Sequence, residues 1–287
     1  MKRFLLSLLA LTVSASAIDL KGDFQGPLGL QLYSLRETFK KDPTAALDQT
    51  KALGFPIAEL YSGVPLEPEK MKAELTARGI TPIAGHFSYD ALKKDPAPSV
   101  KAAQTLGLKY AGVAWIPHEI GSFGEGDVKR AAADFHAFGE AFKAAGIQFF
   151  YHVHGYEFRP VSEGASETLF DLLARETKPE LVAFEMDVFW VFQPGADPVK
   201  YLAKYPGRWH LMHLKDIRKG ARTGVFTGKA PLTDDVPLGT GQVPWPAVLK
   251  AAAQAGVKYY FLEDESPTVD AALPESVKYL ETVKFAP

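Results

Sequence analysis

The chain has 287 residues, of which 47% are hydrophobic and 23% are charged, and its formal net charge is -2. This length and composition suit one large globular domain with a substantial core. The near-neutral charge provides no basic surface for a polyanion. The absence of cysteine excludes disulfides, thiolate metal sites and a cysteine nucleophile.

Residues 1–17 have the three-part pattern of a secretory signal peptide. Lys2 and Arg3 precede an apolar run over 4–13, and small residues follow at 15–17. The apolar run is too short to span a bilayer, so we expect cleavage after Ala17 rather than a retained membrane anchor. An exported protein without cysteines suits the bacterial periplasm.

Strand-like and helix-like segments alternate through the rest of the chain. Apolar segments that predict buried strands span 28–33, 56–61, 80–86, 110–115, 147–152, 181–187, 209–213 and 258–263. The helical segments span 44–53, 67–78, 99–106, 128–145, 167–176, 198–204, 245–255 and 266–283. Eight strand–helix pairs predict a single α/β domain over 18–287, a (β/α)8 TIM barrel. A doubly wound open sheet is the alternative, but no glycine-rich turn follows the first strand.

Nearly every predicted strand ends in a polar side chain. These residues are Gln31, Glu59, His86, His152 with His154, Asp187, His213, and Glu263 with Glu265. Charged residues are rarely fully buried unless they are paired or coordinated, so a core does not explain the pattern. The carboxyl ends of barrel strands form the active-site face, which makes these residues the candidate site.

Four of these residues predict a metal site. His152, Asp187, His213 and Glu263 end four strands that are neighbours in a closed barrel, at heights that let them converge on one ion. Two imidazoles and two carboxylates suit Mn²⁺, Co²⁺, Fe²⁺ or Zn²⁺ better than Ca²⁺, with Mg²⁺ as a further candidate.

Other polar residues have simpler explanations. Gln31 is as well explained by a hydrogen bond within the barrel mouth as by substrate contact, and Glu59 by pairing with a lysine or histidine. Glu185 and Glu265 are compatible with solvated strand ends, and His118 with a surface loop.

We interpret two residues near the seventh strand, His210 and Arg208, as structural. We interpret the long loop after this strand as functional. His210 alternates with the strand's inward residues, and Arg208 precedes the strand at the end opposite the active site. The irregular segment 217–244 leaves this strand at its carboxyl end, and long loops in compact folds are usually functional.

Several motifs together resemble a known family. They are LGLQLYSLR, AELYSG, GHFS, YHVHGYEF, EMDVFWVFQPGADPVKYLAKYPGRWHLMHLKD, PLGTGQVPW and FLEDE. From Leu28 to the C-terminus, the chain resembles the sugar phosphate isomerase/epimerase family of xylose isomerase-like TIM barrels, whose superfamily includes the AP endonuclease 2 fold. The fifth-strand motif resembles that of a subgroup with Y-H-N-H-x-x-E-F.

The resemblance implies a divalent metal at the ends of strands five to eight. Asp187, His213 and Glu263 match three of the family's ligand positions. His152 stands where many epimerases have a glutamate, which weakens a mechanism with one carboxylate on each face of the sugar. His154 and Glu157 are then candidates for the second acid/base or for support of the ligands.

The expected chemistry is isomerisation or epimerisation of a sugar or keto-sugar through an enediolate. Glu263 or Glu157 would remove the proton next to the carbonyl, and the substrate-binding candidates are Glu59, His86, Lys215 and Gln31. The alternative is a dehydratase or keto-glycoside lyase, in which the same intermediate expels a neighbouring substituent.

Two other classes of protein are less favoured. A DNA endonuclease is incompatible with export and the acidic charge balance, so no nucleic-acid partner is expected. A non-catalytic sugar-binding barrel would not need four metal-type ligands. The partner is therefore a small carbohydrate, with no stable membrane anchor and with oligomerisation left open.

Overall fold

The computed structural model of the protein describes residues 18–285, and the predicted signal peptide lies outside the described residues. Within this range, eight parallel strands close into a barrel in the order β1-β10-β7-β6-β5-β4-β3-β2. The strands are β1 (Leu28–Gln31), β2 (Ile57–Leu60), β3 (Thr81–His86), β4 (Tyr110–Val113), β5 (Gln148–His152), β6 (Val182–Asp187), β7 (Trp209–Leu214) and β10 (Tyr259–Leu262). The predicted barrel is confirmed.

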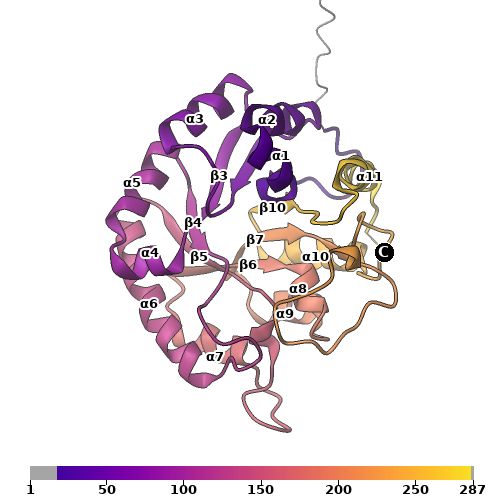
Figure 1. The fold of residues 1–287 in the computed structure, drawn as a ribbon. Helices are drawn as coiled ribbons and strands as arrows, with labels where there is room; N and C mark the ends of the chain where they lie inside the picture. Colours follow the sequence, from indigo (N-terminus) through magenta and orange to yellow (C-terminus); the bar gives the residue numbers. More distant parts are fainter. Residues whose placement is uncertain (1–17, 286–287) are drawn as a thin grey trace, which may run out of the picture.

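Helices surround the strands (Figure 1). The main helices are α2 (Pro43–Ala52), α3 (Pro68–Ala77), α5 (Ala97–Leu106), α6 (Glu125–Ala144), α7 (Leu169–Glu176), α9 (Pro198–Lys204), α10 (Trp245–Ala255) and α11 (Val269–Thr282). Proline occupies the first turn of α2, α3, α9 and α10, where its missing N–H costs nothing and its fixed φ favours the helix. The sequence therefore marks these starts clearly.

Several short elements were not predicted. They are α1 (Arg36–Lys41), α4 (Tyr89–Lys94), α8 (Val188–Phe192), the 3-10 turns η1 (Leu32–Leu35), η2 (Tyr156–Phe158) and η3 (Leu232–Asp234), and strands β8 (Asp216–Ile217) and β9 (Asp235–Val236). The first and fourth strands also end two residues earlier than predicted, at Gln31 and Val113.

Apolar side chains fill the inside of the barrel below the strand ends. Phe150, Leu211 and Phe261 belong to a buried cluster that is separate from the larger core between the barrel and its helices. Gly112 makes room for this filling, because a Cβ there would lie 2.3 Å from the carbonyl oxygen of Phe150. The barrel is packed rather than open along its axis, so a ligand can enter only at its mouth.

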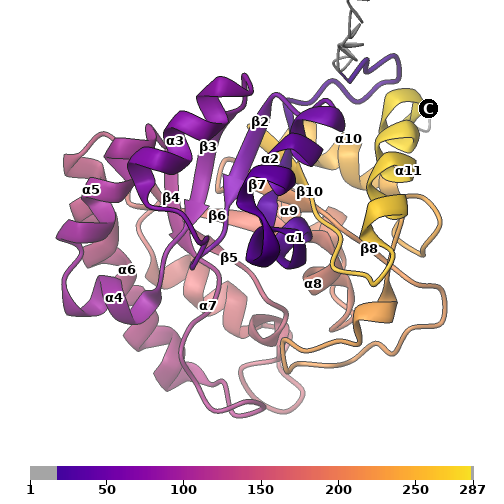
Figure 2. The ribbon, with the colours of Figure 1, turned by 45° about the horizontal axis from the view of Figure 1, so that its top comes forward.

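The two ends of the described chain meet beside α11. The backbone N–H of Lys21 donates to the carbonyl of Glu281 at 2.8 Å, and Figure 2 shows the first described residues next to this helix. Among residues 18–285, no helix is long and apolar enough to cross a membrane.

The long segment after β7 is held by one buried carboxylate. Asp216 accepts hydrogen bonds from the N–H groups of Gly239 at 2.9 Å and Val243 at 3.2 Å, and from the indole of Trp245 at 2.9 Å. The segment 217–244 is therefore partly ordered, with β8 and β9 paired across it. This anchoring brings residues 228–232 to the barrel mouth.

Candidate metal centre and cavity

The four predicted ligands come together at the carboxyl ends of β5, β6, β7 and β10. The Nδ1 atom of His213 lies 2.9 Å from Glu263 Oε2, 3.1 Å from His152 Nε2 and 3.6 Å from Asp187 Oδ2. One donor atom from each residue lies within 4.8 Å of the others, and all four residues are buried. We refer to these four residues as the ligand group.

The chemistry of the ligand group fits a divalent cation. Asp187 Oδ1 accepts the backbone N–H of Trp190 at 3.1 Å, but its buried Oδ2 has no hydrogen-bond partner within 18–285. Burial would raise the pKa of Glu263, but the charges of Lys215 and His213 hold it at about 2. Burial likewise opposes ionisation of Asp187, and the nearby His152 and His213 hold its pKa below the ordinary value. Ionised carboxylates beside imidazoles form the N/O donor set of a transition-metal site.

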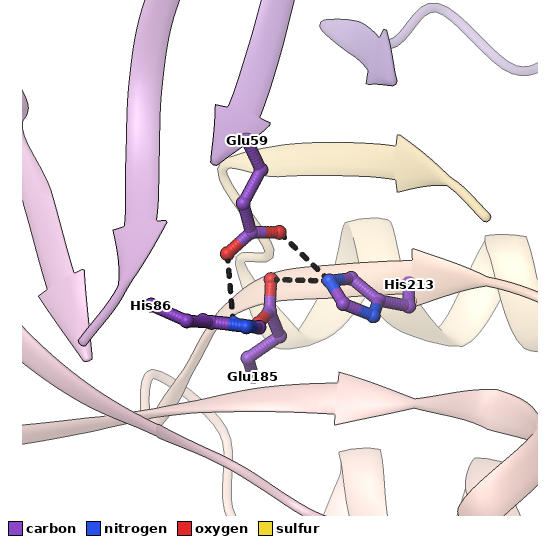
Figure 3. A group of neighbouring side chains, drawn as sticks. All are labelled: Glu59, His86, Glu185 and His213. Atoms are coloured by element: carbon purple, nitrogen blue, oxygen red, sulfur yellow. Dashed lines mark hydrogen bonds and ion pairs between the residues drawn. The ribbon is translucent and has the colours of Figure 1, made fainter. Parts of the chain in front are cut away.

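A second group of side chains lies behind His213 (Figure 3). Glu59 and Glu185 each bridge two imidazoles through separate oxygens. His213 Nε2 lies 2.7 Å from Glu59 and 3.2 Å from Glu185, and His86 Nε2 lies 3.0 Å from both. These atoms could also gather around an ion. Each carboxylate makes one hydrogen bond, Glu59 to His213 Nε2 and Glu185 to His86 Nε2. The other oxygen of each lies at ion-pair distance from the second imidazole, without a hydrogen bond within 18–285. The two carboxylates and His86 thus form a frame of charged side chains around His213.

This frame determines which nitrogen of His213 is free. His213 Nε2 donates its proton to Glu59 at 2.7 Å and faces Glu185 at 3.2 Å, which leaves Nδ1 as the electron-pair donor toward the ligand group. Burial would lower the pKa of His86, but the same two carboxylates raise it to about 9. His86 is therefore the cation that balances part of their charge.

The structure corrects one prediction about this region and decides between two others. Glu185 is fully buried, so it is not a solvated strand end. Glu59 is also fully buried and does not line the cavity, and it pairs with His213 and His86, so the expected pairing with a histidine is confirmed and the substrate-binding role is not supported. The alternation of side chains along a strand would have predicted the burial of Glu185. It lies two residues before Asp187, so both side chains point to the inside of the barrel.

Glu59→Gln is expected to weaken divalent-metal binding by about 10- to 100-fold, which is typical for loss of a partner that orients a ligating histidine. The amide retains the shape of the side chain but can accept from only one of the two imidazoles. A competition titration against a chromophoric chelator measures the effect. Glu69→Gln, on the exposed surface of α3, is the matched control, and equal affinities for both variants would contradict the assigned role.

A cavity of about 620 Å³ opens above the ligand group. The predicted site residues that line it are Gln31, His86, His152, His154, His213, Lys215, Glu263 and Glu265. Gln31 also accepts the backbone N–H of Tyr33 at 3.1 Å, so the hydrogen bond expected at the barrel mouth is present. The cavity floor thus combines metal-type donors with two other polar side chains, His154 and Lys215.

His154 is a neutral imidazole at this floor. Its Nδ1 lies 3.0 Å from the carbonyl oxygen of Ala114 and must donate to it, so Nε2 carries the lone pair. The ring stacks on Trp190 with centroids 4.7 Å apart. Burial, with the neighbouring His152, lowers the pKa of His154 to about 3. The arrangement supplies an oriented proton acceptor.

Lys215 is a buried cation beside the ligand group. Its Nζ contacts the carboxylate of Glu265 and lies 3.8 Å from Glu263 Oε2. Burial would lower its pKa, but the negative charges of Glu263 and Glu265 raise it well above the ordinary value. Glu265 is therefore an ion-pair partner rather than a solvated strand end.

Glu157 lies outside the cavity, contrary to its predicted role in proton removal. Gly155, with φ of 96°, and η2 turn the chain so that the carboxylate folds back beneath the YHVHGYEF turn. There Glu157 accepts the backbone N–H of His154 at 3.0 Å and the hydroxyl of Tyr151. It fixes the position of His154 instead of reaching a substrate.

The burial of Glu157 predicts a pH-dependent stability. Burial raises its pKa to about 7 from an ordinary 4.5, despite the hydrogen bond from Tyr151. The folded chain then holds this proton between pH 4.5 and 7 while the unfolded chain releases it, so stability falls as pH rises through this window. Glu157→Gln should cancel this loss, which is a few kcal/mol at most.

The measurement is the difference in Tm between Glu157→Gln and the natural chain, which should become more positive from acidic to mildly alkaline buffer. Glu140→Gln, exposed on α6, should show no such trend. A pH-independent difference for Glu157→Gln would contradict the protonated state.

Three further residues have structural roles. His118 is not on an open surface: its ring stacks on Trp115 at 4.9 Å, and Nδ1 donates to the carbonyl of Ile116 at 2.7 Å. Arg208 donates to the carbonyl of Ala174 at 3.0 Å, as its structural interpretation required. His210 packs against Tyr110 at the opposite end of the barrel.

Comparisons with known proteins agree with this fold. A family described as "Xylose isomerase-like TIM barrel" matches residues 47–283. An inosose dehydratase 2 from Bacillus cereus is 30% identical, and the match covers 70% of that protein and 68% of this chain. An inosose dehydratase from Clostridium botulinum is 22% identical, and the match covers 88% of that protein and 83% of this chain.

Solved structures show the same architecture. A sugar phosphate isomerase/epimerase from Parabacteroides distasonis superposes with a TM-score of 0.73 at 25% identity, and the match covers 92% of this chain and 100% of that one. The chain therefore belongs to the xylose isomerase-like TIM barrel family. This confirms the family resemblance, and with it the prediction of an enzyme of a sugar-modifying family.

Proposed function

We propose that the protein removes the proton next to the carbonyl group of a sugar or keto-polyol at a divalent-metal site. The observation that carries this proposal is the convergence of His152, Asp187, His213 and Glu263 at the cavity floor. An ion held by these residues would polarise the carbonyl and stabilise the negative charge that develops on its oxygen. The identity of the ion is open among Mn²⁺, Co²⁺, Fe²⁺, Zn²⁺ and Mg²⁺.

His154 is assigned as the base. It lines the cavity, is neutral, and is held by Ala114 and Trp190 so that only Nε2 can accept a proton. Glu263 also lines the cavity and was predicted to accept this proton. It lies 2.9 Å from His213, and we assign it as a metal ligand instead. General bases contribute typically 10²–10⁴-fold to proton transfer, and most when their pKa lies near the operating pH. With a pKa of about 3, His154 is a weak base at neutral pH, so we expect a contribution at the lower end of this range.

Lys215 is assigned as a cationic anchor for a substrate hydroxyl. Its ammonium lies among Glu263, Glu265 and Asp235, which keep it charged. Because its pKa is raised, the ammonium holds its proton, so it would donate a hydrogen bond to a hydroxyl and stabilise negative charge on an oxygen as it leaves.

This pair of groups favours elimination of water over isomerisation. Among the groups that line the cavity, His154 is a neutral imidazole and Lys215 is a cation beside the ligand group, whereas Glu157 is withdrawn beneath the turn. A base acting on one carbon and a cation that stabilises the oxygen leaving the next carbon suit a dehydration. The two relatives named inosose dehydratase support the same reaction class. Isomerisation or epimerisation is the second candidate, supported by the likeness to the Parabacteroides protein.

The test has two stages. Elemental analysis should find about one divalent ion per chain, and incubation with inosose and a panel of keto-sugars in D₂O should show exchange of the proton next to the carbonyl. Loss of water identifies a dehydratase, whereas exchange with only a change of configuration or carbonyl position identifies an isomerase or epimerase. A metal-free chain that exchanges no proton refutes the proposal.

We also infer that residues 1–17 are removed on export and that 18–287 form the mature domain. Support comes from the sequence pattern alone. Intact-mass analysis of the protein from a periplasmic extract should give a chain beginning at Ile18. A chain that retains Met1 in that extract would contradict the inference.

A further inference from the structure

The cavity mouth exposes apolar side chains that the ligand group does not explain. Within residues 18–285, three large hydrophobic residues are exposed: Tyr33 at 37%, Leu232 at 48% and Ile120 at 57%. Tyr33 and Leu232 both line the cavity above the ligand group, and Ile120 does not. Apolar exposure that gathers at a cavity rather than scattering singly over the surface marks a binding surface.

The Tyr33 ring is held in place before any ligand arrives. It meets the edge of Tyr61 at 5.4 Å, and the guanidinium of Arg36 lies 4.6 Å from its centre on the ring face. Tyr61 in turn packs edge-on against the buried ring of Phe39 at 6.0 Å. A platform fixed by its neighbours loses little entropy on binding.

Two polar side chains line the same cavity without a protein partner. Ser62 follows Tyr61 directly in the chain, and both Ser62 and Asp90 are exposed. Neither side chain has a hydrogen bond or ion pair in the described part of the chain. Aromatic faces next to hydroxyl and carboxylate acceptors match a sugar ring, which has apolar C–H faces and hydroxyls at its rim.

Among the residues that the structure describes, the charge at the mouth is mixed and forms no cluster of cations for a phosphate. The cationic lysines that line the cavity are Lys215, which is paired with acidic groups, and Lys229, whose Nζ lies over the Trp115 ring at 5.0 Å. Asp90 adds negative charge at the mouth itself. A cavity of about 620 Å³ is within the range of roughly 300–1,000 Å³ that accommodates drug-sized ligands, so it has room for more than one ring.

We propose that Tyr33, Tyr61, Ser62, Asp90 and Leu232 form a subsite for a second, uncharged sugar ring. The substrate is then a glycoside of the keto-sugar rather than a free or phosphorylated monosaccharide. This inference rests on the proposed function, which puts the carbonyl of the first ring at the ligand group.

Binding of unreactive sugars tests the subsite without turnover. Glucose, cellobiose, maltose and glucose 6-phosphate are titrated into the full chain, and dissociation constants are obtained by saturation-transfer NMR. At least one disaccharide should bind on the order of tenfold more tightly than glucose, the gain expected from one aromatic stacking contact. Tyr33→Ala and Leu232→Ala should reduce this preference. Ile120→Ala, which removes a similarly exposed side chain outside the cavity, should preserve it.

Three results would overturn the subsite: neither disaccharide binds more tightly than glucose, glucose 6-phosphate binds more tightly than both, or Tyr33→Ala and Leu232→Ala keep the full preference for the disaccharide. Failure of the proposed function would instead be seen as absence of bound metal and of proton exchange. The two failures are therefore measured separately.

Discussion

Asp187→Asn should lower the affinity for divalent metal by at least about 100-fold, more than the loss of an outer partner causes. An asparagine can still accept the N–H of Trp190 and cap α8, so the fold should be retained. What it lacks is the negative charge at the buried Oδ2, which faces His152 at 3.5 Å and His213 at 3.6 Å. Elemental analysis and a chelator competition titration measure the loss.

Asp197→Asn is the matched control for this substitution. Asp197 caps α9 through the N–H of Val199 at 3.0 Å and does not line the cavity. It should keep metal content and affinity. If Asp187→Asn also kept both, the ligand group would not be a metal site and the proposed function would fail with it.

His154→Ala should reduce proton exchange and turnover by about 10²-fold while the metal stays bound, the lower end of the usual range because the pKa of His154 is low. The side chain packs against the ring of His152 at 5.4 Å and is not one of the four predicted ligands. The variant should therefore lose activity and keep its metal content. The rate of solvent exchange at the carbon next to the carbonyl, measured at saturating substrate, isolates the chemical step from binding.

His118→Ala is the control for this second variant. His118 also donates Nδ1–H to a backbone carbonyl and also stacks on a tryptophan, but it does not line the cavity. It should therefore lose stability rather than chemistry. Equal losses of exchange for the two variants at equal Tm would show that His154 acts through packing and not as a base.

The barrel was predictable because buried parallel strands are nearly continuous apolar runs. α9 and α10 were predicted to the residue, since each begins with proline in its first turn. The missed elements are short and depend on side chains that act across turns. Asp187 caps α8 and Ser88 caps α4. Isolated helices of this length are not stable, so sequence periodicity alone could not reveal them.

The sequence by itself determined the ligand group, because side chains at the carboxyl ends of adjacent barrel strands must lie on one face. Only the tertiary structure decided which neighbouring side chains contact His213 and His154 and which line the cavity. Glu59 and Glu185 turn toward His213, and Glu157 folds under His154. These directions depend on a turn and on contacts between residues far apart in the chain, which strand periodicity does not encode.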